Sequence, residues 1–184
     1  TGRWMGVGGG LLTSGFIAAG AASGPANTNA TEIWNGAGWT TVNNVTDARR
    51  YLSGGGPTTA ALIFGGGPAP SVPNQKLTES WNGVGWTTVN ELNTGRQYGS
   101  GICGADAQTN ALFAGGQVPA ATGKTEQWDG STWSEVALLG NPRAQMAGSS
   151  AASSTAGIVS GGQPYTNVTE EWTKAVSAKT VTVS

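Results

Sequence analysis

Residues 77–89 read LTESWNGVGWTTV, two short runs rich in β-branched and aromatic residues on either side of an Asn-Gly pair. Asn-Gly strongly favours a tight hairpin turn because both residues tolerate positive φ angles. The pair recurs at Asn35-Gly36, and Asp129-Gly130 stands at the corresponding place further along. This segment therefore predicts a β-hairpin that is used repeatedly along the chain.

Working outward from the hairpin, tryptophan, arginine and glutamate residues recur at four positions with a nearly fixed spacing. The first tryptophan recurs at steps of 47, 47 and 44 residues, the second at steps of 47, and an upstream arginine at 46, 47 and 47. A glutamate stands two residues before each first tryptophan. Such a period indicates a repeat architecture, here with four copies of one unit. The recurring residues are Trp34, Trp81, Trp128 and Trp172; Trp39, Trp86 and Trp133; Arg3, Arg49, Arg96 and Arg143; and Glu32, Glu79, Glu126 and Glu170.

Each unit contains the pattern of four short strands. In the second unit, Tyr51–Ser53 is followed by the apolar run Ala60–Phe64, a glycine cluster at 65–67, and then the hairpin. No stretch has a convincing apolar period of 3.6 residues, so we expect essentially no helix. The sequence predicts one all-β domain over 1–184, with Thr180–Val183 as the last strand. The units span approximately 1–45, 46–92, 93–139 and 140–184.

The order of these residues resembles the kelch repeat, in which a Gly-Gly doublet, an aromatic residue, a Trp and an Arg follow one another. The resemblance covers the whole chain, although Trp stands where kelch units usually have Tyr, the first unit has only Gly20, and the fourth lacks a second Trp. The Thr-Glu-x-Trp-Asn-Gly variant is similar to kelch-like repeats in tail-fibre and other structural proteins of bacteriophages. The matching residues are Gly65-Gly66, Trp81, Trp86 and Arg96, and then Gly115-Gly116, Trp128, Trp133 and Arg143.

The resemblance implies an all-β, kelch-like β-propeller, with one four-stranded antiparallel blade per repeat. Four blades are the lower end of the range for propellers. A closed four-bladed ring and an arc of a larger or shared ring are therefore both open at this point. Residues present once per blade are expected to be structural. We expect the paired tryptophans to face each other across adjacent strands and each Arg and Glu to form an ion pair or hydrogen-bonded network. Cys103 is expected in the core.

One loop varies in length between units, whereas its neighbours do not. The step from the end of the second strand to the third-strand Thr is 13 residues after Gly65, 10 after Gly115 and 8 after Gly161. Loops on a rigid scaffold often carry recognition, although neutral surface insertions explain the variation equally well. These loops are Ala21–Asn29, Pro68–Gln75, Gln117–Gly123 and Gln163–Asn167, which we expect on one face. The candidate ligand-binding residues are Asn27, Asn29, Ser71, Asn74, Gln75, Gln117, Thr122, Gln163, Tyr165 and Asn167.

The composition offers little to catalysis. Histidine is absent, which removes the usual general base and most transition-metal sites. We predict no catalytic residues, no metal site and no cofactor. With a net charge of -1 and no basic stripe, nucleic acid is not an expected partner. Membrane insertion is not expected either, because the most apolar stretch, Phe16–Ala22, is too short to span a bilayer.

The leading hypothesis is a non-enzymatic propeller module of a phage fibre, another virion-surface protein or another extracellular structural protein. Its expected role is host-surface or glycan recognition and assembly, and its expected location is the virion surface or the extracellular space. The expected partners are a host-surface glycan or protein and other subunits of the same assembly, including a homo-oligomer. One alternative is a kelch-type adaptor that binds a protein partner. A lower alternative is a carbohydrate-active enzyme that uses two carboxylates.

Overall fold

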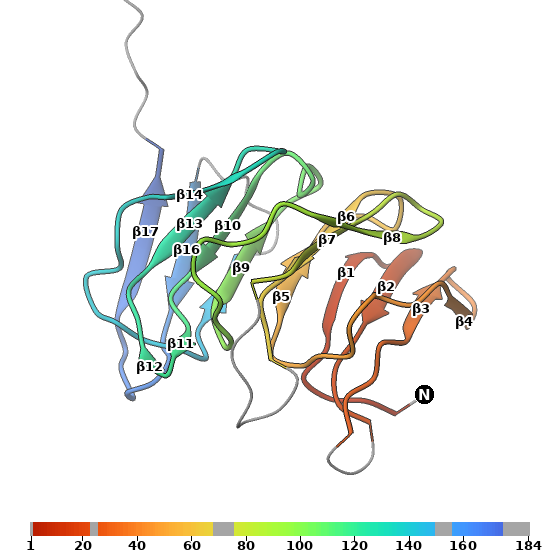
Figure 1. Cartoon of the computed structure of the whole chain (residues 1–184), viewed down its shortest axis with the longest axis horizontal. Helices are drawn as coiled ribbons and strands as arrows, with labels where there is room; N and C mark the ends of the chain where they lie inside the picture. The colour runs from red at the N-terminus through yellow and green to blue at the C-terminus, as the bar shows by residue number, and fades with distance from the viewer. Residues whose placement is uncertain (1, 23–25, 68–75, 150–155, 175–184) are drawn as a thin grey trace, which may run out of the picture.

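The computed structural model describes residues 2–22, 26–67, 76–149 and 156–174. Within these ranges the regular secondary structure consists of strands, and no helix is present. Four antiparallel sheets, each drawn from one repeat, are arranged like the blades of a propeller (Figure 1). The predicted all-β fold is therefore confirmed. The expected strand at Thr180–Val183 lies outside the described residues.

The first two sheets each have four strands in sequence order. Blade 1 comprises β1 (Val7–Leu11), β2 (Ser14–Ala18), β3 (Thr31–Trp34) and β4 (Trp39–Val42). Blade 2 comprises β5 (Ser53–Gly55), β6 (Ala61–Phe64), β7 (Thr78–Trp81) and β8 (Trp86–Val89).

The other two sheets follow the same order. Blade 3 comprises β9 (Ser100–Cys103), β10 (Ala111–Ala114), β13 (Thr125–Trp128) and β14 (Trp133–Glu135). Its variable loop forms a small hairpin of β11 (Gln117–Val118) and β12 (Ala120–Ala121). Blade 4 has three described strands, β15 (Ala147–Gly148), β16 (Ala156–Ser160) and β17 (Thr169–Thr173).

The hairpin between the third and fourth strands forms as its sequence predicts. In blade 2, Trp81 and Trp86 are cross-strand partners with ring centroids 5.3 Å apart. Asn82 Oδ1 accepts hydrogen bonds from the backbone N–H groups of Val84 and Gly85, each at 3.0 Å, which fixes the turn. The corresponding tryptophans of blades 1 and 3 pair in the same way, at 5.7 and 5.4 Å. The tryptophan pairs thus face each other within each hairpin.

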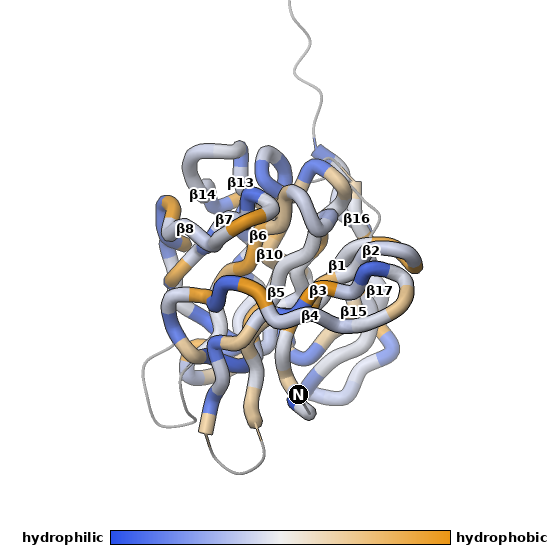
Figure 2. Tube along the Cα trace, turned by 90° about the vertical axis from the view of Figure 1, so that its right-hand side faces the viewer, coloured by the Kyte–Doolittle hydropathy of each residue, from blue (hydrophilic) through white to orange (hydrophobic). Residues whose placement is uncertain are grey.

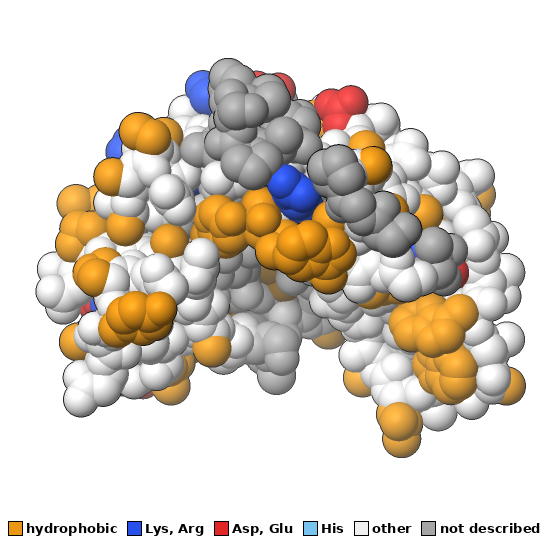
Figure 3. All heavy atoms as spheres, turned by 90° about the horizontal axis from the view of Figure 1, so that it is seen from below, with side chains coloured by type: hydrophobic (Ala, Val, Ile, Leu, Met, Phe, Trp, Pro, Cys, Tyr) orange, Lys and Arg blue, Asp and Glu red, His pale blue; other side chains and the backbone are white. Residues whose placement is uncertain are grey.

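The blades are arranged as an open arc. Along the inner edge, β1 lies against β5, β5 against β9, and β9 against β15. Figure 3 shows the result as an arch, hollowed on one side between two lobes. The hollow is lined by the glycine-rich inner strands and has a volume of about 550 Å³. The described residues are therefore arranged as an arc and not as a closed ring of four blades.

Three hydrophobic clusters fill the spaces between neighbouring blades. The strand β6, which is one of the hydrophobic segments in Figure 2, contributes to two of them. Ala61 and Ile63 belong to the cluster shared with blade 1, and Leu62 and Phe64 to the cluster shared with blade 3. Alternate side chains of a strand point to opposite faces of its sheet. An unbroken apolar strand is therefore what a blade with neighbours on both faces requires.

The second tryptophan of each hairpin joins its blade to the preceding one. Trp86 Nε1 donates to Thr31 Oγ1 at 2.9 Å, and its ring packs edge-on against Phe16 in blade 1. Trp133 of blade 3 repeats this arrangement with Thr78 Oγ1, also at 2.9 Å. Each joint between blades combines burial of a large aromatic surface with a hydrogen-bonded indole N–H. In both joints the tryptophan comes from the later blade and inserts into the earlier one.

The repeated arginines lie in the core and pair with the repeated glutamate of the same unit. Arg96 is fully buried. Its Nη1 donates to Glu126 and to Thr94 O at 3.0 Å, its Nε to Gly115 O at 2.9 Å, and its Nη2 to Phe113 O at 2.6 Å. One planar guanidinium thus ties three segments of the blade together.

Each glutamate also holds the connection that enters its blade. Glu79 accepts from the backbone N and the Oγ1 of Thr46, both at 2.7 Å, in the link from blade 1 to blade 2. Glu126 accepts from the backbone N of Asn93 at 2.7 Å in the next link. The ion pair therefore fixes both the interior of a blade and its attachment to the preceding connection.

Glycine on the inner strands permits close approach of neighbouring blades. A Cβ added at Gly55 of β5 would lie 2.9 Å from Cys103 Cβ in β9, whereas one added at Gly38, in an exposed turn, would meet nothing within 4 Å. Cys103 is fully buried, as expected.

We expect Gly55→Ala to lower the free energy of unfolding by about 1–3 kcal/mol, because blades 2 and 3 must separate to admit the methyl group. The matched change Gly38→Ala is expected to shift it by less than about 0.5 kcal/mol. Urea unfolding of the two variants measures both. Equal stability would show that the inner strands do not approach as closely as described.

Candidate functional site

The variable loops of the four blades emerge at one end of the molecule. Each begins beside the segment that follows a repeated arginine, as the bridges Trp4↔Ala21, Arg50↔Gly67, Gln97↔Gln117 and Ala144↔Gln163 show. This end lies at the bottom of Figure 1, near β11 and β12, and faces the viewer in Figure 3. We call it the loop face.

The structure describes seven of the ten predicted ligand-binding residues. Ser71, Asn74 and Gln75 lie outside the described residues, and none of the others lines either of the two cavities described here.

Several of these residues are instead engaged in holding the loops. Asn27 Nδ2 donates to Ala48 O at 3.4 Å, Asn29 O accepts from Val45 N, and Thr122 Oγ1 accepts from Lys124 N. Gln117 and Gln163 occupy bridge positions at the start of their loops. The remaining two, Tyr165, which is exposed, and Asn167, follow in the loop of blade 4.

A different set of residues lines the inner edge of the arc, two positions after each repeated arginine. Met5, Tyr51, Tyr98 and Gln145 all have left-handed backbone conformations, with φ between 57° and 60°. Such conformations are costly for large side chains and persist where the surroundings impose them.

A ladder of backbone hydrogen bonds stabilises this conformation. Tyr51 N donates to Met5 O at 3.1 Å, Tyr98 N to Tyr51 O at 3.1 Å, and Gln145 N to Tyr98 O at 2.7 Å. Each bond crosses from one blade to the next. The ladder runs along the whole arc and links the backbones of these four residues.

Tyr51 and Tyr98 form the centre of this line. Their ring centroids are 4.0 Å apart, and Arg50 Cζ lies 5.2 Å from the centroid of Tyr51. Burial, together with the side-chain hydrogen bond between Tyr98 and Tyr51, raises the pKa of Tyr98 to about 12. The Tyr98 hydroxyl therefore stays protonated at neutral pH.

Each tyrosine directly follows a residue with a buried polar atom that has no hydrogen-bond partner within the described part of the chain. These atoms are Arg50 Nε and Gln97 Oε1. The stacked tyrosines with Arg50 and Gln97 form what we call the tyrosine cluster. Tyr and Arg are enriched where proteins bind partners, because they combine large rigid surfaces with hydrogen-bonding ends.

The sequence contains a signal for the tyrosine cluster that loop lengths do not reveal. The chain has only three tyrosines, and two of them stand at the same position of the repeat. That position was assigned to the start of a strand, where a left-handed conformation is not expected.

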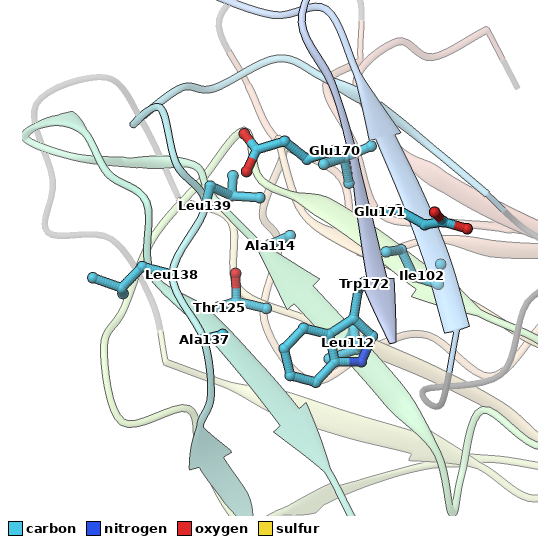
Figure 4. Close-up of a pocket in the computed structure, with 12 residues that line it drawn as sticks. Ile102, Leu112, Ala114, Thr125, Ala137, Leu138, Leu139, Glu170, Glu171 and Trp172 are labelled. Atoms are coloured by element: carbon cyan, nitrogen blue, oxygen red, sulfur yellow. The ribbon is translucent and has the colours of Figure 1, made fainter. Parts of the chain in front are cut away.

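The space between blades 3 and 4 contains a cavity of about 90 Å³ (Figure 4). Leu112, Ala114 and Thr125 of blade 3 line one side, and Trp172 of β17 lies opposite. Thr125 occupies the position of Thr31 and Thr78, but its buried Oγ1 has no partner among the described residues. The fourth repeat has no second tryptophan, so the cavity marks the place where the other joints insert an indole.

The acidic groups outside the repeat pattern do not assemble into a site. Glu135 pairs with Lys124 at 2.6 Å on the surface, and Asp106 accepts from Asn110 Nδ2 at 2.9 Å. Over residues 2–22, 26–67, 76–149 and 156–174, no three His, Cys, Asp or Glu side chains are grouped so that they could hold a metal ion. In the same ranges no helix is long and apolar enough to cross a membrane.

The chain matches no protein-family model and no curated protein sequence. The resemblance to kelch-like repeats therefore stays a prediction from the sequence, whereas the blade-like architecture is a property of the structure.

The two threonine positions provide a direct test of the joints. Thr78→Val removes the acceptor of a buried indole N–H, and we expect it to lower the free energy of unfolding by about 1–3 kcal/mol. Thr125→Val removes a hydroxyl that has no partner, so we expect no loss and a gain of up to about 1 kcal/mol. Guanidinium unfolding of both variants measures these changes in the free energy of unfolding. Equal losses would contradict the assignment of the cavity as an unfilled joint.

Proposed function

We propose that this chain is a non-enzymatic β-propeller module of a phage fibre, another virion-surface protein or another extracellular structural protein. In this proposal the loop face binds a host-surface glycan or protein. The sequence resemblance to kelch-like repeats of phage structural proteins supports the setting. The observation that carries the proposal is the tyrosine cluster, which the backbone ladder holds in a strained conformation.

The chemistry of the tyrosine cluster suits a ligand with both apolar and hydroxyl-rich surfaces. The tyrosine rings supply a rigid aromatic surface, Arg50 adds a cation beside it, and the Tyr98 hydroxyl and Gln97 amide supply hydrogen-bonding groups. Sugars present hydroxyls next to apolar C–H faces, which favours a glycan ligand.

The experiment compares binding to a glycan array and to host cells by the wild-type chain, Tyr51→Asn, Tyr98→Asn and Tyr165→Ala. Asparagine tolerates a left-handed backbone, so the first two variants remove the aromatic rings without adding strain. We expect at least about a tenfold loss of affinity for each of them, as for a residue at the centre of an interface. Tyr165→Ala, which alters an exposed loop residue away from the tyrosine cluster, is expected to bind normally.

Loss of binding in Tyr165→Ala with normal binding in the other two would contradict the tyrosine cluster as the site and would favour the variable loops. Absence of binding by the wild-type chain to any glycan or host surface would contradict the proposed function. Circular dichroism of each variant checks that the fold is retained.

A further inference from the structure

The two ends of the arc expose surfaces whose counterparts, in the described part of the chain, pack between neighbouring blades. Trp39 of blade 1 is 54% exposed, whereas its counterpart Trp133 in blade 3 is 5% exposed. Leu11 and Leu12, at the turn between β1 and β2, are also exposed. Trp34 Nε1 donates to Leu12 O at 3.0 Å, which places this turn beside the tryptophan pair. The outer face of blade 1 therefore carries an apolar patch of Trp39, Leu11 and Leu12.

The corresponding groups of blades 2 and 3 show what such a patch contacts. In both internal joints the second tryptophan inserts into the preceding blade and donates to a threonine. The turn between the first two strands reaches back as well. Thr58 in blade 2 hydrogen-bonds Ser14 of blade 1 at 2.5 Å, and Gln108 in blade 3 donates to Ser80 of blade 2 at 2.7 Å.

Blade 4 has the surface that accepts the tryptophan in such a joint. The strand register aligns Thr169 with Thr31 and Thr78, because each pairs with the last residue of the second strand of its blade. Ile158, two residues before that partner, corresponds to Phe16 and Leu62. Ile158 is 46% exposed, whereas Leu62 is fully buried. The outer face of blade 4 thus offers a threonine hydroxyl beside an exposed apolar side chain. Thr169 Oγ1 shares a hydrogen bond of 2.9 Å with Ser160 Oγ and has a further lone pair for an indole N–H.

We propose that a second copy of this chain docks head to tail on the first, with blade 1 of one copy packed on blade 4 of the other. In this joint Trp39 of one copy covers Ile158 of its neighbour, and Trp39 Nε1 donates to Thr169 Oγ1. The turn with Leu11 and Leu12 covers the adjoining edge. The same kind of interface already occurs twice inside the chain, where Trp86 and Trp133 insert into the preceding blade. A second copy of the chain supplies both surfaces of this interface, and we therefore take it as the partner. This inference is independent of the ligand proposed for the loop face.

The receiving face is more polar than its internal counterparts, since Ser160 and Glu171 stand where blade 2 has Phe64 and Ser80. We therefore expect an association that is weaker than the internal joints and that depends on concentration. A head-to-tail interface leaves one free end on each partner. Two copies close into a ring if the rotation allows it, and otherwise the copies add into a filament.

Sedimentation velocity of the full chain over a range of concentrations tests the proposal. The wild-type chain is expected to form dimers or larger species as concentration rises. Trp39→Asp and Ile158→Asp should each remain monomeric. Val84→Asp changes an equally accessible residue at a turn of blade 2 and should associate like the wild type.

Mixing the two disrupted variants distinguishes a head-to-tail joint from any other contact. Trp39→Asp keeps an intact blade 4 face, and Ile158→Asp keeps an intact blade 1 face, so an equimolar mixture should regain a heterodimer. A wild-type chain that stays monomeric at the highest concentration overturns the proposal. So does self-association of Trp39→Asp, or a mixture that stays monomeric while the wild type associates.

Discussion

The structure depends on a charged pair buried inside each blade. A sheet of four strands with three to five residues each encloses little on its own. The repeated arginine compensates by donating to its glutamate and, in the unit of Arg96, to three backbone carbonyls. A buried charge that loses its partner is strongly destabilising. The charged pair therefore keeps its partners only when three segments lie together. These segments are the connection that enters the blade, the glycine doublet after the second strand, and the third strand.

The second constraint is the direction of the joints between blades. In blades 2 and 3 the second tryptophan of the hairpin inserts into the blade before it. One face of such a blade therefore contributes the tryptophan, and the opposite face accepts one from the next blade. This polarity makes the blades add in one sense only and leaves unlike surfaces at the two ends of the arc. It also explains the cavity beside Thr125, because a repeat without its second tryptophan leaves the receiving side of the joint unfilled.

Contacts within one repeat could be predicted from the sequence, because fixed spacing reports on them directly. The hairpin at Asn82, the pairing of Trp81 with Trp86 and the association of Arg96 with Glu126 all follow from residues that recur together. Contacts between repeats could not be predicted in this way. The spacing is the same whichever neighbour receives Trp86, and it is the same in an arc and in a ring.

The candidate site could likewise be predicted from the sequence only in part. Loop length identified a face, since the loops leave equivalent places in each blade, but it did not identify the residues that gather there. The tyrosine cluster arises from a left-handed backbone at Tyr51 and Tyr98 that strand patterning does not reveal. Only the hydrogen-bond ladder between blades accounts for that conformation, and it joins residues about 46 positions apart, as one repeat period requires.

The most direct test of this account is a double-mutant cycle on the buried pair, with Arg96→Met, Glu126→Met and the double variant, measured by equilibrium unfolding. Each single change leaves a buried charge without its partner and is expected to cost about 3–5 kcal/mol. The double change removes both charges, so its cost should fall short of the sum by about 1–3 kcal/mol. Costs that add to within about 0.5 kcal/mol would contradict the central role of the pair.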